Sequence, residues 1–329
     1  MTSRENTGAE SAVSETTASS LDALAGSLWR LLGQKGYTSN EFRYLERRGV
    51  HVTPVHFYSP IPDTSQLADE VWERESELVG IDMNDEGQLH LLGEVFPQFR
   101  AEYEALPTAP SADDPAQFYL GNGMFDGTDA LVLYCMLRHL QPRRVIEVGS
   151  GKSTRLAAQA AHANGSTELV CVEPYPDETL QAGFPGLTSL IESRVEEVGL
   201  DLFRTLDSGD VLFIDSSHVV KIGGDVTYLY LEVLPRLKPG VVVHVHDVFF
   251  PHEYPRSWNM EECRFWNEQY LLQAFLAFNS EFGVLFANRY LATRHGDMMK
   301  EVFPKSPWWG GGSFWMQRRP GLEEIGVLG

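Results

Sequence analysis

The stretch VIEVGSGKST, at residues 145–154, decides how the rest of the chain is organised. A short apolar run ends in Glu147, two glycines follow closely, and a helix-forming segment begins directly after them. This pattern predicts a strand, a tight turn and the start of a helix. Glycines in such a turn let backbone N–H groups approach a ligand, so the turn is the first candidate for a binding site.

Two phosphate-binding patterns do not fit this turn. A nucleoside triphosphate loop needs a glycine five residues before its Gly-Lys pair, and Ile146 stands there instead. A dinucleotide fingerprint needs a third glycine at the position of Thr154. Glu147 at the strand end would also repel a pyrophosphate. A cationic ligand therefore fits the turn better than a phosphate.

An acidic residue followed by Gly-x-Gly resembles the glycine-rich motif of the class I S-adenosylmethionine-dependent methyltransferases. The resemblance covers about residues 118–318. It implies that the carboxylate of Glu147 receives the ammonium group of the cofactor, and that Glu173 binds the ribose. Val195 and Glu196, at the exit of the third predicted strand, are candidates for packing against or bonding the adenine. The cofactor-binding residues that we expect are Glu147, Gly149, Ser150, Gly151, Ser153, Glu173, Val195, Asp215 and Phe125.

Composition favours a small-molecule partner in a reducing compartment. A net charge of −20 argues against nucleic acids and anionic membranes, because phosphates are bound by clustered Lys and Arg. The three cysteines lie far apart, which is typical of free thiols. The sequence shows no signal-peptide pattern and no long apolar stretch. We therefore expect a cytoplasmic protein with no membrane span, and the sequence leaves open whether it forms a homodimer.

Three parts are expected along the chain. Residues 1–20 have almost no large apolar side chains, which predicts a mobile tail. Residues 21–115 should form an N-terminal helical and lid region. Within it, residues 51–63 carry three prolines, two histidines and two aromatics, and form either a packed connector or a lid. A Pro- and Asp-containing loop at 107–115 then leads into a catalytic domain over 116–329.

Strands and helices alternate after the glycine turn, which predicts a mostly parallel sheet with helices on both faces. Two late strands match the antiparallel edge that the methyltransferase fold has. The fold class is thus α/β, with a Rossmann-like, doubly wound sheet of seven strands and an N-terminal helical extension. The expected strands are 144–148, 168–173, 189–198, 210–215, 241–247, 283–292 and 312–318, and the expected helices include 128–140, 153–163, 224–237 and 263–278.

Ionisable side chains gather where the predicted strands end. Ligands of open parallel sheets bind beyond the carboxyl ends of the strands, and that edge should collect several acidic residues and one histidine. Each carboxylate taken alone could instead cap the next helix. Their convergence is what indicates a site. The group consists of Glu147, Glu173, Asp215, His218 and Asp247.

More histidines surround the fifth predicted strand. Side chains alternate along a strand, so His244 and His246 should share one face and Asp247 should take the other. We therefore expect one or two of the histidines near Asp247, which include His252, to be structural. The catalytic candidates are His218, Asp215, Asp247, His246 and His252.

The resemblance leaves two mechanisms open. In one, His218 is a general base that takes a proton from the acceptor, oriented by Asp215 or Asp247. In the other, a divalent metal held by Asp215, Asp247 and His252 lowers the pKa of the acceptor hydroxyl, as in catechol-type O-methyltransferases. Val248 stands where those enzymes have asparagine, which favours the metal-free route.

The resulting expectation is an enzyme that methylates a small molecule, such as a natural-product intermediate, at oxygen rather than nitrogen or carbon. Two alternatives stay open: an enzyme of the same fold that cyclises or cleaves the cofactor, and a cofactor-binding protein without turnover. Aromatic side chains are candidates for an apolar wall against the acceptor or the sulfonium. They are Tyr58, Tyr119, Phe125, Phe249, Phe250, Tyr254, Trp258 and Trp266.

Overall fold

The computed structural model describes residues 14–32 and 40–319, and the chain divides into two compact units, residues 1–68 and 69–329. The first unit contains α1 (Glu15–Leu32), α2 (Asn40–Glu46) and the short helical turn η1 (Thr64–Gln66). Residues 51–63 form neither helix nor strand, and Phe57 and Tyr58 are exposed. The role of this segment as a lid stays a prediction.

Helix α1 overlaps the tail that the sequence predicts to be mobile. It begins at Glu15, six residues before the expected start of the ordered region. The hydroxyl of Ser14 accepts a hydrogen bond from the backbone N–H of Thr17 at 3.3 Å, which caps the first turn. Residues 15–20 are therefore helical, and the rest of the predicted tail, residues 1–13, lies outside the described residues.

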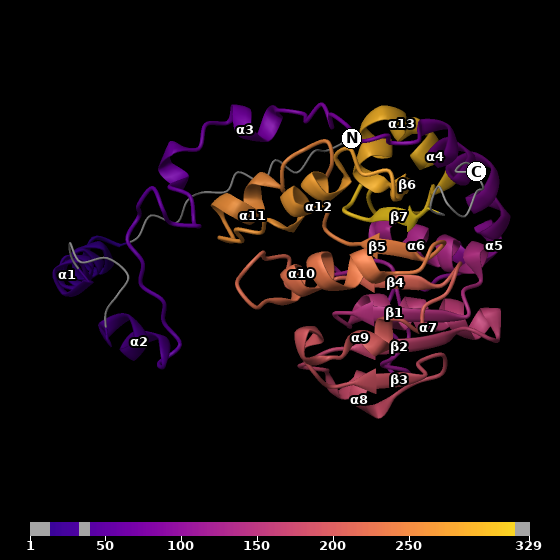
Figure 1. Ribbon diagram of the computed structural model, residues 1–329, viewed down its shortest axis with the longest axis horizontal. Coiled ribbons are helices and arrows are strands. Elements are labelled where there is room, and N and C mark those ends of the chain that lie inside the picture. The colour runs from indigo at the N-terminus through magenta and orange to yellow at the C-terminus, as the bar shows by residue number, and fades with distance from the viewer. Residues whose placement is uncertain (1–13, 33–39, 320–329) are drawn as a thin grey trace, which may run out of the picture. The chain divides into compact units, whose positions relative to one another are not determined.

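Seven strands form one sheet in the second unit, in the order β3-β2-β1-β4-β5-β7-β6 (Figure 1). The five earlier strands are parallel, and β7 runs antiparallel to both of its neighbours. This confirms the predicted doubly wound sheet with an antiparallel edge. The strands are β1 (Arg144–Val148), β2 (Glu168–Val172), β3 (Ser189–Ile191), β4 (Val211–Ile214), β5 (Val242–Val245), β6 (Phe282–Ala287) and β7 (Phe314–Arg318).

Helical segments connect these strands. The α-helices are α3 (Glu70–Glu73), α4 (Asp85–His90), α5 (Arg100–Tyr103), α6 (Gly127–Leu140), α7 (Lys152–Asn164), α8 (Glu178–Ala182), α9 (Leu200–Phe203), α10 (Asp225–Tyr228), α11 (Arg256–Met260), α12 (Glu268–Leu276) and α13 (Asn288–Val302). Shorter or wider turns are η2 (Leu91–Val95), η3 (Phe96–Phe99), η4 (Val195–Glu197), η5 (Leu229–Val233) and η6 (Leu234–Arg236). None of the helices within residues 14–32 and 40–319 has the length and apolar composition that a membrane crossing requires.

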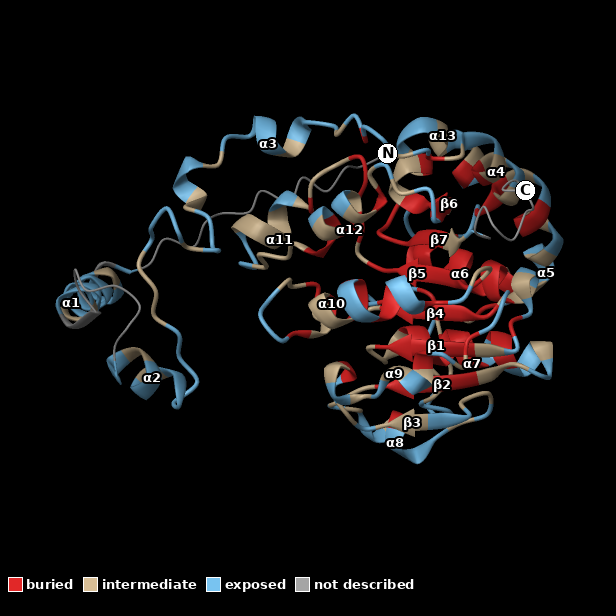
Figure 2. Cartoon of the chain, viewed as in Figure 1, coloured by how far each residue is buried: buried red, intermediate tan, exposed pale blue. Residues whose placement is uncertain are grey.

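Apolar layers cover both faces of the sheet. Successive residues of β1 belong to different layers: Val145 lies in the layer that contains α6 and α7, and Ile146 in the layer of η5 and α12. Figure 2 shows the buried residues concentrated on the central strands, whereas no residue of the edge strand β3 is fully buried. A strand that is buried on both faces has a nearly continuous run of apolar residues in the sequence. These strands could therefore be predicted from the sequence.

The second unit begins well before the predicted boundary at residues 107–115. Phe96 is fully buried, and its ring packs against those of Phe286 at 5.0 Å and Phe303 at 6.1 Å between centroids. Leu92 belongs to the same apolar layer as α6. Residues 69–106 are thus part of the compact unit that carries the sheet, because their apolar face is buried against it.

Two late elements differ from the predicted ones. The strand expected over 283–292 ends at Ala287, and α13 follows because Asn288 is held from two sides: its backbone N–H donates to Ser313 at 2.9 Å and its side chain to Asp129 at 2.7 Å. The helix expected over 263–278 starts only at Glu268. Cys263 has a left-handed φ of 55°, which a right-handed helix does not accommodate.

Candidate active site

The glycine turn rests directly on the end of β4. Gly149 has a φ of +83°, and its N–H donates to the carbonyl of Val172 at 3.0 Å. A Cβ atom at this position would lie 2.6 Å from the carbonyl carbon of Asp215 and would overlap the carbonyl oxygen. Only glycine meets both requirements, the left-handed φ and the close backbone approach.

Two cavities meet at this turn. The larger, of about 730 Å³, is bordered by the turn residues 149–153 and by the His and Asp side chains that follow β4 and β5. The smaller, of about 290 Å³, is bordered by Val195, Glu196 and Ser216, among others. Gly149, Glu173 and Asp215 line both cavities. The arrangement therefore suits an elongated ligand that passes over the turn with one half in each cavity.

Most of the predicted cofactor residues border these cavities. Ser150, Gly151, Ser153 and Phe125 line the larger one and Val195 the smaller one. Glu173 accepts a hydrogen bond from the backbone N–H of Ser150 at 3.1 Å, which fixes its carboxylate at the junction.

Glu147 lies beneath the turn and not on a cavity wall. It is fully buried, and its carboxyl group accepts a hydrogen bond from Ser153 Oγ at 2.6 Å. Burial raises the pKa of Glu147 to about 8, so the group is largely neutral at pH 7. The predicted direct contact with the cofactor's ammonium group is thus not what the structure shows, because Glu147 faces the interior between β1 and α7.

The buried Glu147 predicts a stability that falls as the pH rises. The unfolded chain loses this proton near pH 4.5, whereas the folded chain keeps it to about pH 8. Between these values the folded state binds more protons, so the free energy of unfolding falls by up to about 1.4 kcal/mol per pH unit. Glu147→Gln should remove this loss. The free energy of unfolding of the variant, measured with urea, should therefore increase relative to that of the wild type from pH 5 to pH 8. Glu192→Gln, at an exposed site, is the control and should show the same pH dependence of the free energy of unfolding as the wild type. If the difference in this free energy between Glu147→Gln and the wild type did not change with pH, the result would contradict a raised pKa for Glu147.

His218 lies at the centre of three carboxylates. Its Nδ1 is 2.9 Å from Glu268 Oε2, and its Nε2 is 3.4 Å from Asp215 Oδ1 and 3.5 Å from Asp247 Oδ2. The imidazole is buried yet borders the larger cavity. One nitrogen is therefore anchored inside the protein, and the other is directed towards the strand-end carboxylates.

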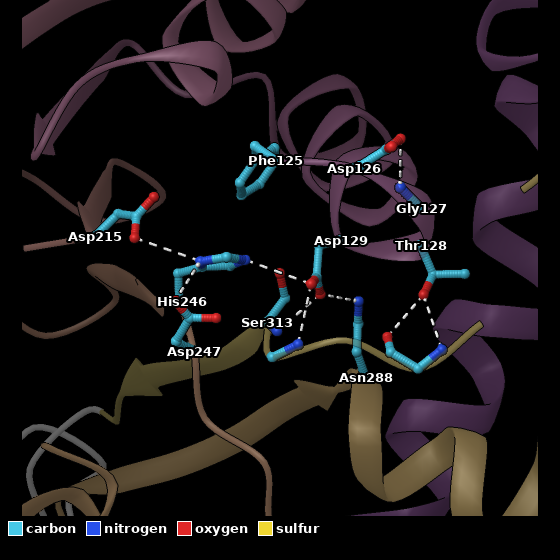
Figure 3. Close-up of polar contacts among 12 residues, drawn as sticks. Phe125, Asp126, Gly127, Thr128, Asp129, Asp215, His246, Asp247, Asn288 and Ser313 are labelled. Carbon is cyan, nitrogen blue, oxygen red and sulfur yellow. Dashed lines mark hydrogen bonds and ion pairs between the residues drawn. The ribbon is translucent and has the colours of Figure 1, made fainter. Parts of the chain in front are cut away.

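His246 forms a second centre beside the first. Its Nδ1 lies 3.3 Å from Asp215 and 3.6 Å from Asp247, and its Nε2 lies 3.4 Å from Asp129 (Figure 3). Asp129 is buried and also accepts a hydrogen bond from Asn288 Nδ2 at 2.7 Å. The two histidines thus share Asp215 and Asp247.

Asp129 and Glu268 were not among the predicted site residues. Both come from helices, α6 and α12, and neither belongs to a motif. A signal does exist in the sequence: Asp129 precedes the apolar run ALVLYCML, where an unpaired carboxylate would be costly to bury. Such a residue needs charged or hydrogen-bonding partners, which here are Asn288, the backbone N–H groups of Gly312 and Ser313, and His246.

Two residues of the site have a left-handed backbone conformation. His218 has a φ of 58° and Asp247 a φ of 59°. The strict alternation expected along the fifth strand therefore fails at Asp247, whose carboxylate turns to the side of His246. Non-glycine residues in this region cost about 1–3 kcal/mol each and are typical of functional sites.

Two other histidines are structural, as expected. The ring of His244 stacks between Phe213 at 4.2 Å and Trp315 at 4.1 Å, within a row of residues paired across three strands. His252 hydrogen-bonds Thr293 Oγ1 at 3.1 Å and does not border the larger cavity. The structure therefore does not bring His252 to the carboxylates: it lies seven residues after the end of β5 and is not part of the group of Asp215, His246 and Asp247 that could hold a metal.

The neighbouring carboxylates keep both histidines of the site protonated at neutral pH. Burial opposes the charge on His218, but hydrogen bonds with Asp215 and Glu268 raise its pKa to about 10. Burial likewise opposes the charge on His246, whose pKa is nevertheless raised by Asp247 and Asp215. Burial by itself would raise the pKa of Asp215, yet the two histidines hold it below its usual range. At neutral pH the group is a network of ion pairs.

Aromatic side chains form much of the remaining wall. Of the predicted set, Phe125, Phe249, Trp258 and Trp266 border the larger cavity. The other three residues of this set in the second unit do not border the larger cavity. Phe250 and Tyr254 are buried in the core, and Tyr119 is not among the residues that line the cavity. Trp308 and Trp309, which the sequence analysis missed, complete the wall from the loop before β7.

Comparison with known proteins agrees with this geometry. A family model for a methyltransferase domain matches residues 146–248, from β1 to just beyond Asp247. An uncharacterized protein of Archaeoglobus fulgidus is 32% identical over 163 residues, which cover 47% of this chain and 73% of that protein. The chain belongs to the class I S-adenosylmethionine-dependent methyltransferases. This methyltransferase is therefore an enzyme that uses S-adenosylmethionine.

Solved structures also resemble the methyltransferase. The O-methyltransferase TomG of Streptomyces achromogenes, involved in tomaymycin synthesis and solved with the cofactor, is 17% identical with a TM-score of 0.35; the match covers 73% of this chain and 97% of that one. An O-methyltransferase of Bacillus cereus, solved with S-adenosylhomocysteine, is 15% identical with a TM-score of 0.33 and coverages of 70% and 91%.

The residues at the junction of the cavities fit this cofactor. The turn at Gly149 has no side chain that would fill the space between the two halves. The hydroxyl of Ser216 borders the smaller cavity, and among the described residues it has no hydrogen-bond partner. A buried polar group without a partner is costly, so a nucleoside that supplies one would be stabilised there. Glu173 is placed to accept hydrogen bonds from its hydroxyls.

Proposed function

We propose that this methyltransferase transfers the methyl group to a hydroxyl oxygen of a small-molecule acceptor, and that His218 takes the hydroxyl proton. The observation that carries the proposal is the orientation of His218, with Nδ1 held 2.9 Å from Glu268 and Nε2 beside the cavity that the glycine turn borders. An imidazole anchored at one nitrogen and accessible at the other has the geometry of a general base.

The residues of the chain then have separate roles. When bound, S-adenosylmethionine supplies a methyl group on a positively charged sulfur, which leaves as a neutral thioether. The turn at Gly149 and the carboxylate of Glu173, which border both cavities, would hold this donor beside the acceptor. The acting form of His218 is the neutral imidazole, which has first released its Nε2 proton to solvent; as the new C–O bond forms, the hydroxyl proton passes to this Nε2. The buried carboxylate of Glu268 stabilises the resulting imidazolium.

The size of the larger cavity supports a small acceptor. Its volume of about 730 Å³ lies within the range of roughly 300–1,000 Å³ typical of small-molecule sites. The proposal extends to a natural-product intermediate as acceptor and to the cytoplasm as compartment. Cys135, Cys171 and Cys263 are free thiols, which suits a reducing compartment.

Incubation with a methyl-labelled cofactor tests the proposal. The purified enzyme should transfer the label to the oxygen of hydroxylated small molecules and should release S-adenosylhomocysteine in equal amount. Cofactor incubated without an acceptor is the control. Release of methylthioadenosine in that control would instead support an enzyme that cyclises or cleaves the cofactor, and would contradict methyl transfer as the main reaction.

A metal-assisted O-methyltransferase is the second candidate. Ligand atoms of Asp215, His246 and Asp247 lie within 4.8 Å of one another, a group that could hold a divalent cation. Such an ion would lower the pKa of the acceptor hydroxyl. Val248, which stands where the metal-dependent catechol-type enzymes have asparagine, favours the metal-free route.

Chelation separates the two candidates. Under the preferred mechanism, treatment with EDTA followed by gel filtration should leave methyl transfer within about twofold of the untreated rate, because His218 needs no metal. Addition of Mg²⁺ or Mn²⁺ should then change the rate little. A loss on chelation of tenfold or more that Mg²⁺ or Mn²⁺ restores would establish the metal-assisted route.

A further inference from the structure

We infer that the acceptor is a hydroxylated aromatic acid whose carboxylate is bound by Arg289. The inference rests on the proposed function, because it assigns a substrate class to the same cavity. It starts from a cation that neither the fold nor the proposed transfer of the methyl group uses.

Arg289 is a half-buried cation that no carboxylate contacts directly among the described residues, although the charge of Asp129 acts on it from a distance. It is the second residue of α13 and borders the larger cavity. Among the described residues its guanidinium forms no ion pair, and its Nε is buried without a hydrogen-bond partner. Its one defined contact is with the ring of Phe249, at 5.5 Å from the centroid. Buried charges are normally paired, so an unpaired guanidinium at a cavity wall indicates an anionic ligand.

The other cations of the cavity are placed differently. Arg264 is already neutralised by Glu262, at 2.5 Å, and stacks on Trp258. Lys152 begins α7 directly after the glycine turn, on the side where the cofactor is expected. Arg289 instead adjoins Asn288, which binds Asp129 in the histidine network. Arg289 is therefore the cation on the acceptor side.

A continuous row of aromatic rings joins the proposed base to this guanidinium. The ring of His218 lies 4.4 Å from that of Trp266, and Trp266 lies 5.1 Å from Trp258. Trp258 lies 5.2 Å from Phe249, whose ring contacts Arg289. The tryptophan and phenylalanine rings of this row meet edge to face, and an aromatic acceptor can add to the row through contacts of the same kind.

Charge fixes the orientation of the acceptor along this wall. Near His218 the cavity presents Asp215 and Asp247, which would repel a carboxylate. At the far end of the wall the planar fork of Arg289 can bind a carboxylate through two parallel hydrogen bonds. A hydroxyl at His218 and a carboxylate at Arg289 thus define the acceptor as a hydroxylated aromatic acid.

Benzoate and benzamide are minimal probes of this site, because they differ in charge and share a ring. Calorimetric titration of the protein saturated with S-adenosylhomocysteine should show benzoate binding at least about tenfold more tightly than benzamide. Arg289→Gln should abolish this preference, so that benzoate and benzamide bind with about equal affinity. The matched control is Arg294→Gln in the same helix, since Arg294 is exposed and pairs with Glu75 at 2.9 Å. The control should keep the full preference.

Two results would overturn the inference. One is equal affinity of the wild type for the two probes, including no binding of either. The other is a preference that survives in Arg289→Gln or disappears equally in Arg294→Gln. Binding of S-adenosylhomocysteine, measured first in each titration, separates the two levels: its presence without a benzoate preference overturns the acid-binding role alone, whereas its absence overturns the proposed function and this inference with it.

Discussion

Gly149→Ala is expected to lower the affinity for S-adenosylhomocysteine by about 100-fold or more. The added methyl group would overlap the carbonyl of Asp215 and would force a left-handed φ of +83° on a non-glycine residue. Either the turn or the end of β4 must move. Because Gly149 and Asp215 both border the two cavities, any such movement disturbs the junction over which the cofactor lies. Isothermal titration of the purified variant measures the loss.

Gly165→Ala is the matched control for this experiment. Gly165 also has a left-handed φ, of +81°, but no atom lies within 4 Å of an added Cβ. It ends α7, away from both cavities, so affinity should stay within about twofold of the wild type. Circular dichroism and thermal unfolding show whether both variants are folded. Folded Gly149→Ala with normal affinity, or an equal loss in Gly165→Ala, would contradict the role given to the turn.

The central fold could be predicted because its strands are buried on both faces. Val145 and Ile146 point into different apolar layers, so β1 reads as one apolar run, and β2, β4 and β5 behave alike. The antiparallel edge came only from the resemblance to a family. Helix α13 could not be predicted, because its start depends on Asn288 contacting Asp129, which lies 159 positions away in the sequence.

The site residues also fall into those that the sequence predicts and those that it does not. Asp215, His218 and Asp247 follow strands, and strand ends of a parallel sheet meet at one edge, so the sequence indicates their convergence. Asp129, Glu268 and Arg289 come from helices whose packing the sequence does not specify. The side on which Asp247 lies depends on one backbone angle, a φ of 59°, which ordinary strand alternation does not foresee.

His218→Gln is expected to reduce kcat by about 100-fold to 10,000-fold while affinity for S-adenosylhomocysteine stays within about threefold. General bases typically contribute a rate factor of about this size. The cofactor is held by the turn and by Glu173, which the substitution does not touch. His252→Gln is the control, because His252 lies outside the larger cavity and should leave kcat unchanged.

The pH dependence distinguishes a base from a residue that only positions the acceptor. With a pKa of about 10, His218 is protonated at neutral pH and must lose its proton before it can accept another. The neutral fraction grows about tenfold per pH unit below the pKa, so kcat/KM should rise with pH from 7 to 9 and level off near 10. In His218→Gln this limb should vanish. A flat wild-type profile beside a large loss in His218→Gln would mean that His218 orients the hydroxyl through its charge, and that the proton leaves by another route.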